Sequence, residues 1–343
     1  MKDTAVETAE TMVKRISLRA RGLRIHEREG DSVTDMGSTL PLRERTFPGA
    51  CQNGEVTAAL DFLLELLDLE AIEVNIFRGR HPNEERQRTF GGQVAAQALM
   101  AAGRTVESGR VHSLHSYFLR PGDPTTPILY EVDRIRDGRS FTTRRVVAIQ
   151  HGRAIYNMQA SFHTDETSLA HQMPMPAAPA PESIPPLAER IKNEYGNIDE
   201  WFKRAHPIDQ RFVGELPWSP DRHKEPHQQI WIKADGVLPA DDQLLHDCVV
   251  TYASDMSLFD AILAPHSIRW DDGTFMGASI DHCMWFHHPV KADEWLLYDM
   301  ESPIAYGGRG VAHGFLFNEA GELKVSMVQE GLTRLIDPSK RSQ

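Results

Sequence analysis

An internal repeat constrains the fold of this chain more strongly than any other feature of its sequence. Residues of the same type recur in the second half at offsets of 168 to 170 positions. The matched pairs are Pro121/Pro289, Tyr130/Tyr298, Arg139/Arg309, Gly152/Gly321 and Met158/Met327. The aromatic pair Tyr117-Phe118 is answered by Trp285-Phe286 at the same offset of 168. Such a period indicates two tandem copies of one structural unit.

In the first copy, residues 89–106 are predicted to form a buried helix. The segment is strongly apolar, and its interior polar side chains are Gln93 and Gln97. The chain enters the helix through Gly91-Gly92. This pair lacks the spacing of a phosphate-binding loop, so close packing is its first interpretation.

In the second copy, Leu244–Pro265 is predicted to be the equivalent helix. Apolar residues recur at three- and four-residue spacing and cover most of the circumference, which indicates a helix inside the protein. Asp241 and Asp242 stand where an N-cap belongs, and Pro265 is expected to stop the helix. Asp255 stands in its middle, where an ionised carboxylate is costly unless it is paired or hydrogen-bonded. The plainer interpretation is that Asp255 lies on a narrow solvent-exposed face of the helix.

Strands are predicted around both helices, because short segments rich in β-branched and aromatic residues alternate with turn residues. An amphipathic helix over 56–69 and a strand over 70–77 precede the first buried helix. The first copy continues with strands over 111–119, 127–136, 140–151 and 154–163. In the second copy strands are expected near 210–216, 228–234, 279–288, 294–303, 309–318 and 323–333. The short loops favour antiparallel pairing.

These elements predict an α+β fold of two tandem units, each an antiparallel sheet wrapped around a buried central helix, which is the double hotdog arrangement. The Pro- and Ala-rich stretch after the first copy indicates a semi-rigid linker. The predicted parts are a flexible N-terminal extension (1–54), an N-terminal hotdog unit (55–166), a Pro-rich linker (167–206), a C-terminal hotdog unit with the catalytic residues (207–336) and a tail (337–343).

Charge and composition limit the classes of partner. The net charge of −12 argues against nucleic acid, because binding phosphate along a nucleic acid needs a basic surface. The three cysteines have no metal-binding or disulfide spacing. No apolar run has the length of a membrane span, and no signal peptide is recognisable, so we expect a cytoplasmic protein without a membrane span.

Several long segments resemble the acyl-CoA thioesterase II family. They are FRGRHPNEERQRTFGGQVAAQAL, HSLHSYFLRPGDP, DGRSFTTRRVVAIQHG, SIDHCMWFHHP, DEWLLYDMESPIAYGGRG and VSMVQEG. The resemblance runs from about Val56 to Leu335. It implies a double hotdog fold and hydrolysis of acyl-CoA thioesters to free fatty acid and CoA, without metal or organic cofactor.

The family's catalytic residues are an Asp on the second buried helix, a Thr or Ser on a strand and a Gln on the last strand. Position by position, the resemblance implies Asp255, Ser279 and Gln329 for these roles. Many members have Thr at the hydroxyl position. Serine keeps the hydrogen-bonding group but lacks the methyl that restricts χ1.

This trio suits thioester hydrolysis, in which the main task is to deliver water. Asp255 can act as general base, and a largely apolar site would raise its pKa towards neutrality. Ser279 and Gln329 can position the water by donating and accepting hydrogen bonds. The acyl oxyanion needs donors, and the helix N-terminus at Gly91, Gly92 and Gln93 is the predicted substrate-binding group. Gln93 also corresponds roughly to Asp255 when the two helices are overlaid, which predicts one catalytic and one supporting half.

Other chemically active side chains have plainer interpretations. The histidines His282, His287 and His288 lie near Ser279, but alternate faces of one strand cannot bring all three to a metal. Nothing near Cys283 supports a nucleophilic thiol. Arginines such as Arg309 could meet CoA phosphates, although arginines on a sheet face are commonly just solvated.

Two other functions stay open at this point. A catalytically silent module that binds acyl-CoA would not require the trio. A hotdog enoyl-CoA hydratase would need an Asp/His pair on an overhanging loop, and the nearest pair, Asp260 and His266, lies in a different setting. A homo-oligomer, either a dimer or a tetramer, is expected, and the preferred acyl chain length is left undetermined.

Overall fold

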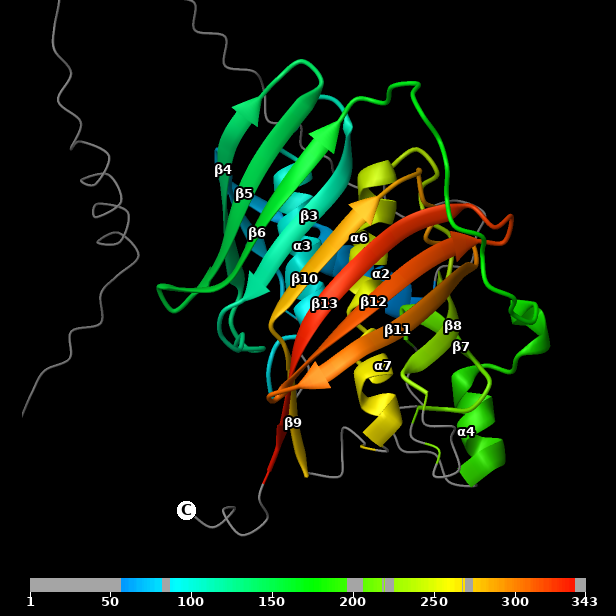
Figure 1. Cartoon of the computed structure of the whole chain (residues 1–343). Coiled ribbons are helices and arrows are strands. Elements are labelled where there is room, and N and C mark those ends of the chain that lie inside the picture. Colours follow the sequence, from blue (N-terminus) through cyan, green and yellow to red (C-terminus); the bar gives the residue numbers. More distant parts are fainter. Residues whose placement is uncertain are drawn as a thin grey trace, which may run out of the picture. The chain divides into compact units, whose positions relative to one another are not determined.

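The computed structural model describes residues 57–81, 87–195, 206–217, 219, 225–266, 268 and 274–336. The predicted extension over 1–54 and the tail over 337–343 lie outside the described residues. The described part contains a large antiparallel sheet that curves around two central helices (Figure 1). The predicted α+β class and double hotdog arrangement are therefore confirmed.

Thirteen strands of the described residues form one continuous sheet. In chain order they are β1 (Glu70–Glu73), β2 (Ile76–Gly79), β3 (Arg110–Phe118), β4 (Ile128–Asp137), β5 (Phe141–Gln150), β6 (Arg153–His163), β7 (Ile208–Val213), β8 (His227–Ala234), β9 (Phe275–Ser279), β10 (Asp281–Phe286), β11 (Leu296–Tyr306), β12 (Arg309–Asn318) and β13 (Leu323–Leu335). In space they run β1-β2-β4-β5-β6-β3-β10-β13-β12-β11-β8-β7, and β9 pairs with β13.

The helices are short apart from the two central ones. They are α2 (Ala58–Leu67), α3 (Gly91–Gly103), α4 (Leu187–Tyr195), α6 (Gln243–Ser254) and α7 (Asp260–Leu263), with 3₁₀ turns η1 (Pro181–Ser183) and η2 (Ala264–His266). In Figure 1, α3 and α6 lie together on one side of the sheet, and α7 follows α6.

The two copies meet at the pairing of β3 with β10, which carries the signature of the repeat. Tyr117 pairs with Asp281, and Ser113 pairs with Trp285. Adding 168 to 117 gives 285, and adding 168 to 113 gives 281, so the repeat exchanges the two pairs. A twofold relation of this kind has its centre at the pair His115/Cys283, whose numbers also differ by 168. The offset in the sequence is thus a pseudo-twofold axis in the structure.

The first central helix is enclosed, as its composition predicts. Every residue of α3 from Gly92 to Ala102 is buried. Gln97 is satisfied inside: its amide donates to the Leu66 carbonyl at 2.7 Å, and its oxygen accepts from the Tyr130 hydroxyl at 2.7 Å. A buried amide is tolerable under these conditions because its donors and acceptor are paired.

The second central helix is shorter than predicted, which is a correction to the expected Leu244–Pro265 element. Asp242 caps α6 as expected, its side chain accepting from Leu245 N–H at 3.2 Å. The helix ends at Ser254, and the chain turns before α7 and η2. Asp255 is therefore the C-cap of α6 rather than a residue in the middle of a continuous helix. The apolar spacing continues across the break because α7, like α6, is buried.

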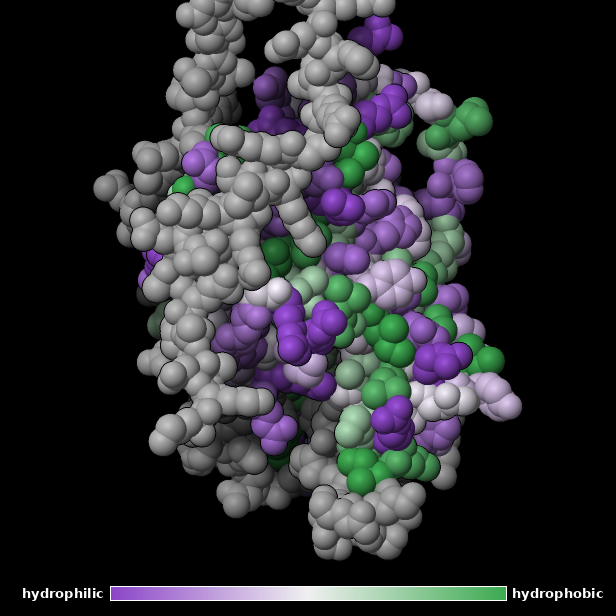
Figure 2. Space-filling view, turned by 90° about the vertical axis from the view of Figure 1, so that its left-hand side faces the viewer, coloured by the Kyte–Doolittle hydropathy of each residue, from purple (hydrophilic) through white to green (hydrophobic). Residues whose placement is uncertain are grey.

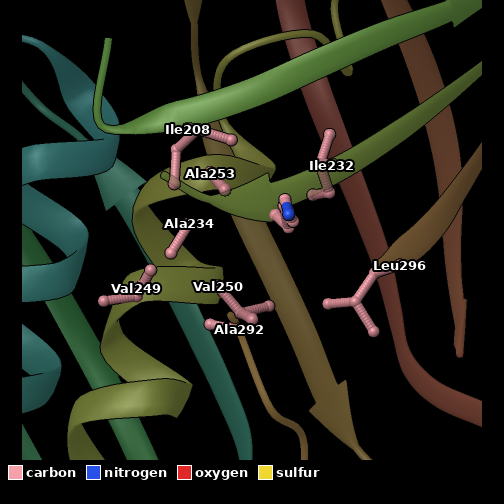
Figure 3. A pocket seen from close by; sticks show the side chains of 9 residues that line it. Ile208, Ile232, Ala234, Val249, Val250, Ala253, Ala292 and Leu296 are labelled. Carbon is pink, nitrogen blue, oxygen red and sulfur yellow. The ribbon is translucent and has the colours of Figure 1, made fainter. Parts of the chain in front are cut away.

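The space between α6 and the strands of the second copy is filled. Figure 3 shows Val250 of α6 pointing toward Leu296 of the sheet, and Val249, Ala253 and Ile232 also line the space between them. The void left among the lining side chains is about 10 Å³. A single water needs about that much room, so this part of the core offers no space to an acyl chain.

Smaller departures from the predicted strands also have local causes. The strand expected over 70–77 is a hairpin of β1 and β2, turning at Asn75, whose φ of 66° asparagine tolerates better than most residues. A separate strand, β9, precedes β10 and was not predicted.

The linker packs against the second copy, where the Trp231 indole donates to the Pro179 carbonyl at 2.8 Å. The domain limits over 55–166, 167–206 and 207–336 stay predictions. None of the helices among the described residues is long and apolar enough to cross a membrane.

Candidate active site

Asp255 lies where α6 stops, and buried polar contacts hold that end of the helix. The Tyr298 hydroxyl donates to the Ser254 carbonyl at 2.9 Å, and the Ser254 hydroxyl donates to the Thr251 carbonyl at 2.9 Å. The last carbonyls of a helix have no partner within the helix, and a buried carbonyl without a donor is energetically costly. These two hydrogen bonds supply the missing donors. The chain then turns, and the Asp255 side chain projects from a fixed helix end.

Two further predicted residues meet Asp255 from separate strands. The Ser279 hydroxyl, at the end of β9, donates to Asp255 Oδ1 at 3.2 Å. The Gln329 side-chain amide, on β13, donates to the same oxygen at 2.6 Å. Residues separated by up to 74 positions therefore converge on one carboxylate oxygen.

The N-terminus of α3 completes the surroundings of this carboxylate. The Gly92 backbone N–H donates to Asp255. A Cβ on Gly91 would lie 2.7 Å from Asp255 Oδ2, and one on Gly92 would lie 2.5 Å from the Tyr252 carbonyl oxygen. The glycine pair thus allows α3 and the end of α6 to approach closely. The positive end of the α3 dipole also favours a negative charge there.

The carboxylate of Asp255 has a raised proton affinity. Burial raises its pKa from 3.8 to about 6. The hydrogen bonds from Gln329, Ser279 and the Gly92 backbone act in the opposite direction, as does the positive charge of Arg88. Desolvation disfavours the ionised form, whereas donors to that form favour it. The balance leaves a carboxylate that is mostly ionised at pH 7 and poised to accept a proton.

One hydrogen-bonding atom of the Gln329 side chain has no partner. The residue is fully buried, and its side-chain oxygen has no hydrogen-bond partner. Most buried polar atoms in folded proteins are paired, so a buried acceptor beside a carboxylate deserves an explanation. An acceptor in this place can receive a hydrogen bond from a water or a ligand that enters the site.

A buried histidine, His282, contacts Ser254, the residue that precedes Asp255. His282 Nε2 lies 2.8 Å from the Ser254 hydroxyl oxygen, and the residue is fully buried. Burial lowers its pKa to about 4, so the imidazole is neutral at physiological pH. Its place next to Ser254 makes it part of the structure that positions Asp255, rather than a metal ligand.

The predicted correspondence between Gln93 and Asp255 is wrong. Gln93 lies in the first turn of α3, whereas Asp255 is the C-cap of α6. The helices run antiparallel: a Cβ on Gly103, at the end of α3, would meet Leu244 at the start of α6, while Gly92 meets Tyr252. The Gln93 side chain donates to the Arg80 carbonyl at 3.4 Å. The substrate-binding role of Gly91, Gly92 and Gln93 stays a proposal.

The surroundings of the other chemically active residues do not favour a catalytic or metal-binding role for them. Burial raises the pKa of the Cys283 thiol, which disfavours a nucleophilic thiolate. His287 lies 2.8 Å from the Ser326 hydroxyl through Nε2. In the part of the chain that the structure describes, no group of three His, Cys, Asp or Glu side chains could hold a metal ion. Asp260 is buried in α7 while His266 is exposed, so they do not share one environment.

Sequence reasoning missed three contributors: the hydrogen bond from the Gly92 N–H to Asp255, the Tyr298 hydroxyl and Arg88. Arg88 donates to the Gly277 carbonyl at 2.9 Å and so joins the entry of α3 to β9. Tyr298 was recognised as half of a repeat pair, and its role at the helix end follows from that pair only when the fold is known. The Gly91-Gly92 pair was the available signal for close approach.

Two family models match the chain in its two halves. Residues 80–163 match the model described as "Acyl-CoA thioesterase N-terminal domain", and residues 200–332 match the model described as "Acyl-CoA thioesterase". Among curated proteins, human acyl-coenzyme A thioesterase 8 is 41% identical over 283 residues, which cover 79% of this chain and 88% of that protein. Acyl-CoA thioesterase 2 of Haemophilus influenzae is 36% identical over 286 residues, covering 80% and 98%.

Solved structures give the same result. The acyl-CoA thioesterase II TesB2 of Mycobacterium marinum is 44% identical, with a TM-score of 0.67, covering 80% of this chain and 99% of that chain. A hot dog fold protein of Alicyclobacillus acidocaldarius is 18% identical, also with a TM-score of 0.67, covering 82% and 100%. The second likeness concerns the fold alone.

Proposed function

The chain belongs to the acyl-CoA thioesterase family and is a hydrolase of acyl-CoA, and we propose that it hydrolyses fatty acyl-CoA with water activated by Asp255, Ser279 and Gln329. The observation that carries this proposal is the convergence of the hydroxyl of Ser279 and the amide of Gln329 on one oxygen of Asp255. A carboxylate with raised pKa, fixed by two donors, is suited to accept a proton from water.

The reaction starts when a water donates one hydrogen bond to the Asp255 carboxylate and another to the unpaired oxygen of Gln329. The water oxygen then attacks the thioester carbonyl carbon while Asp255 takes its proton. Collapse of the tetrahedral intermediate breaks the C–S bond and expels the CoA thiolate, which takes up the proton held by Asp255. The products are a free fatty acid and CoA.

Charge on the acyl oxygen develops next to the N-terminus of α3. We assign its stabilisation to the first turn of α3, Gly91, Gly92 and Gln93. The Gly92 N–H already donates to Asp255, so the N–H groups of Gly91 and Gln93 and the helix dipole are the proposed partners of the acyl oxygen. Ser279 and Gln329 keep the carboxylate in one orientation, so little reorganisation is needed when the water reacts. No metal or organic cofactor has a step in this scheme.

A catalytically silent acyl-CoA binding module is the alternative. Such a protein would bind acyl-CoA but release no thiol from it. A buried carboxylate with raised pKa is costly to keep and has no use in binding alone, which favours the hydrolase. Nothing in the surroundings of Asp260 and His266 favours a hydratase.

The test is thiol release from acyl-CoA by wild type, Asp255→Asn and a matched control, Asp165→Asn, whose side chain is exposed. Asparagine keeps the shape but cannot accept the proton, so kcat should fall by about 10² to 10⁴ while acyl-CoA binding persists. The control should match wild type. Wild-type activity in Asp255→Asn would refute the proposed role, and no thiol release by wild type with any chain length would favour the binding module.

Three finer properties accompany the proposal. We infer a cytoplasmic protein of fatty acid metabolism that assembles as a homodimer or homotetramer. Light scattering of the full chain would test the assembly.

A further inference from the structure

The Arg88 side chain joins two parts of the chain that both border the Asp255 carboxylate. Arg88 is exposed and lies in the segment that leads into α3. Its guanidinium Nη2 donates to the Gly277 carbonyl of β9 at 2.9 Å, across 189 positions of sequence. The first turn of α3 supplies the Gly92 N–H to Asp255, and β9 ends with Ser279. One arginine therefore connects two of the supports of the carboxylate.

The Gly277 carbonyl lies on an edge of β9 that β13 leaves open. The Ile280 N–H, just after β9, donates to the Glu330 carbonyl of β13 at 2.8 Å. Bonded and non-bonded pairs alternate along antiparallel strands, so Gly277, opposite Thr333, points its backbone groups away from β13. Among the residues that the structure describes, β13 is the strand that pairs with β9. Arg88 thus supplies the donor that a neighbouring strand would otherwise bring.

This directional bond matters because much of the setting of β9 is apolar. Figure 2 shows hydrophobic residues gathered in the lower part of one face, at the height where Figure 1 places α7 and β9. The exposed side chain of Met276 and the buried ring of Phe275, both on β9, are apolar too. Apolar contact is non-directional, whereas a hydrogen bond restricts the distance and angle between its partners.

The hydrogen bond of Ser279 is sensitive to the position of β9. Ser279 follows Gly277 by two residues, and its hydroxyl lies 3.2 Å from Asp255 Oδ1. Most O–H···O hydrogen bonds are about 2.5–3.0 Å long, so a small displacement of the strand would take the hydroxyl out of reach. By holding the Gly277 carbonyl, Arg88 limits that displacement.

Arg88 also carries a positive charge that acts on Asp255. Burial raises the pKa of the Asp255 carboxyl, and the arginine is among the groups that lower it. Titratable side chains also approach from the sheet: Tyr156 on β6, Tyr298 on β11 and His282 on β10. Burial raises the pKa of both tyrosines and lowers the pKa of His282 to about 4, so all three are neutral at pH 7. The ionised form of Asp255 thus depends on Arg88 for a positive charge.

We propose that Arg88 is a positioning residue for thioester hydrolysis: its hydrogen bond fixes β9, and with it Ser279, while its charge stabilises the ionised carboxylate of Asp255. The inference rests on the proposed function of the trio. It assigns two separable roles to one side chain. Arg88→Met keeps much of the aliphatic stem and removes both roles, whereas Arg88→Lys retains the charge but lacks the planar guanidinium donor.

The test is the pH profile of palmitoyl-CoA hydrolysis by wild type, Arg88→Met and Arg88→Lys. In Arg88→Met the acidic limb of kcat/KM should move up by about half a pH unit, because an exposed charge shifts a carboxyl less than a directly paired one. At pH 8, where Asp255 is ionised in every variant, kcat should fall about tenfold because Ser279 is held less well. Arg88→Lys should restore the acidic limb but not the full kcat. The control Arg139→Met, at an exposed arginine between β4 and β5, should match wild type.

A double variant tests whether the hydrogen bond acts through Ser279. In the Ser279→Ala background, Arg88→Met should lower kcat at pH 8 little further, because the serine that it positions is gone. A full additional tenfold loss would contradict that role. A raised KM with unchanged kcat and an unchanged acidic limb would mean that Arg88 binds the substrate instead, and would overturn the inference.

Urea unfolding separates this inference from the proposed function, since it needs no turnover. The loss of stability from pH 4.5 to pH 8, measured against Asp255→Asn in each background, should be larger with Arg88→Met, because burial then raises the pKa of Asp255 without opposition from the arginine. That result supports the role of the charge even if Asp255 proves not to be the base. An unchanged loss would overturn the role of the charge, and an unchanged kcat at pH 8 in Arg88→Met would overturn the role of the bond, whatever Asp255→Asn does to turnover.

Discussion

Replacing Asp255 by asparagine should make the folded protein more stable at high pH, although it removes the proposed base. Burial raises the pKa of this carboxyl from 3.8 to about 6, so the folded state holds a proton more tightly than the unfolded chain. The free energy of unfolding therefore falls as pH rises from about 4 to about 6, and it is fully lowered above that range. The pKa difference corresponds to about 3 kcal/mol at pH 8. The neutral amide of the Asp255→Asn variant carries no such penalty.

The magnitude can be isolated by comparing two pH values. At pH 4.5 part of the penalty is already present, so wild type should lose about 2 kcal/mol relative to Asp255→Asn between pH 4.5 and pH 8. Contacts that asparagine makes less well, such as its amide facing the Gly92 N–H, are independent of pH and cancel in this comparison. Other titrating groups, including Asp247 with its pKa of about 7, are common to both proteins.

Urea unfolding at both pH values measures the effect. Asp165→Asn, changed at an exposed carboxyl, should follow wild type at both values. If the stability difference between Asp255→Asn and wild type were the same at pH 4.5 and pH 8, Asp255 would not be a carboxylate with raised pKa, and the reasoning would fail.

Three more predictions follow from the same contacts. In a pH profile, kcat/KM should fall roughly tenfold from pH 7 to pH 5, because Asp255 with its pKa of about 6 must be ionised to accept a proton; a flat profile would contradict this. Ser279→Ala should lower kcat by about a hundredfold, whereas Ser279→Thr, which keeps the donor, should stay within a few-fold of wild type in the thiol-release assay. Tyr298→Phe leaves the buried Ser254 carbonyl without its donor and should cost about 1–3 kcal/mol in urea unfolding, and an unchanged midpoint would argue against that bond.

The repeat and the buried helices were predictable because the sequence patterns that indicate them can be recognised without knowing the fold. The apolar run of α3 and the 168-residue offset of Tyr117 and Trp285 needed no knowledge of the fold, and the β3–β10 pairing confirms the offset. The end of α6 was not predictable in this way. Apolar spacing continues through Asp255, and the donor that satisfies the helix end comes from Tyr298, 44 positions away from the Ser254 carbonyl that accepts from it.

The environment of the carboxylate has the same non-local origin. Gly92 and Asp255 are far apart in the chain, and only the antiparallel packing of α3 on α6 brings the N–H of one to the carboxylate of the other. Overlaying the two helices by sequence placed Gln93 opposite Asp255, and this was wrong because one begins a helix and the other ends one. The trio itself came from the family resemblance, since no periodicity connects Ser279 with Gln329.

The central claim is that water, and not the Asp255 carboxylate, attacks the thioester. The most direct measurement is hydrolysis of acyl-CoA in ¹⁸O-labelled water, followed by mass spectrometry of the fatty acid and of the peptide that contains Asp255. We predict one ¹⁸O atom in each fatty acid molecule and none in Asp255, even after many turnovers. Label in the Asp255 carboxylate would reveal an acyl anhydride on that residue and would contradict its role as general base.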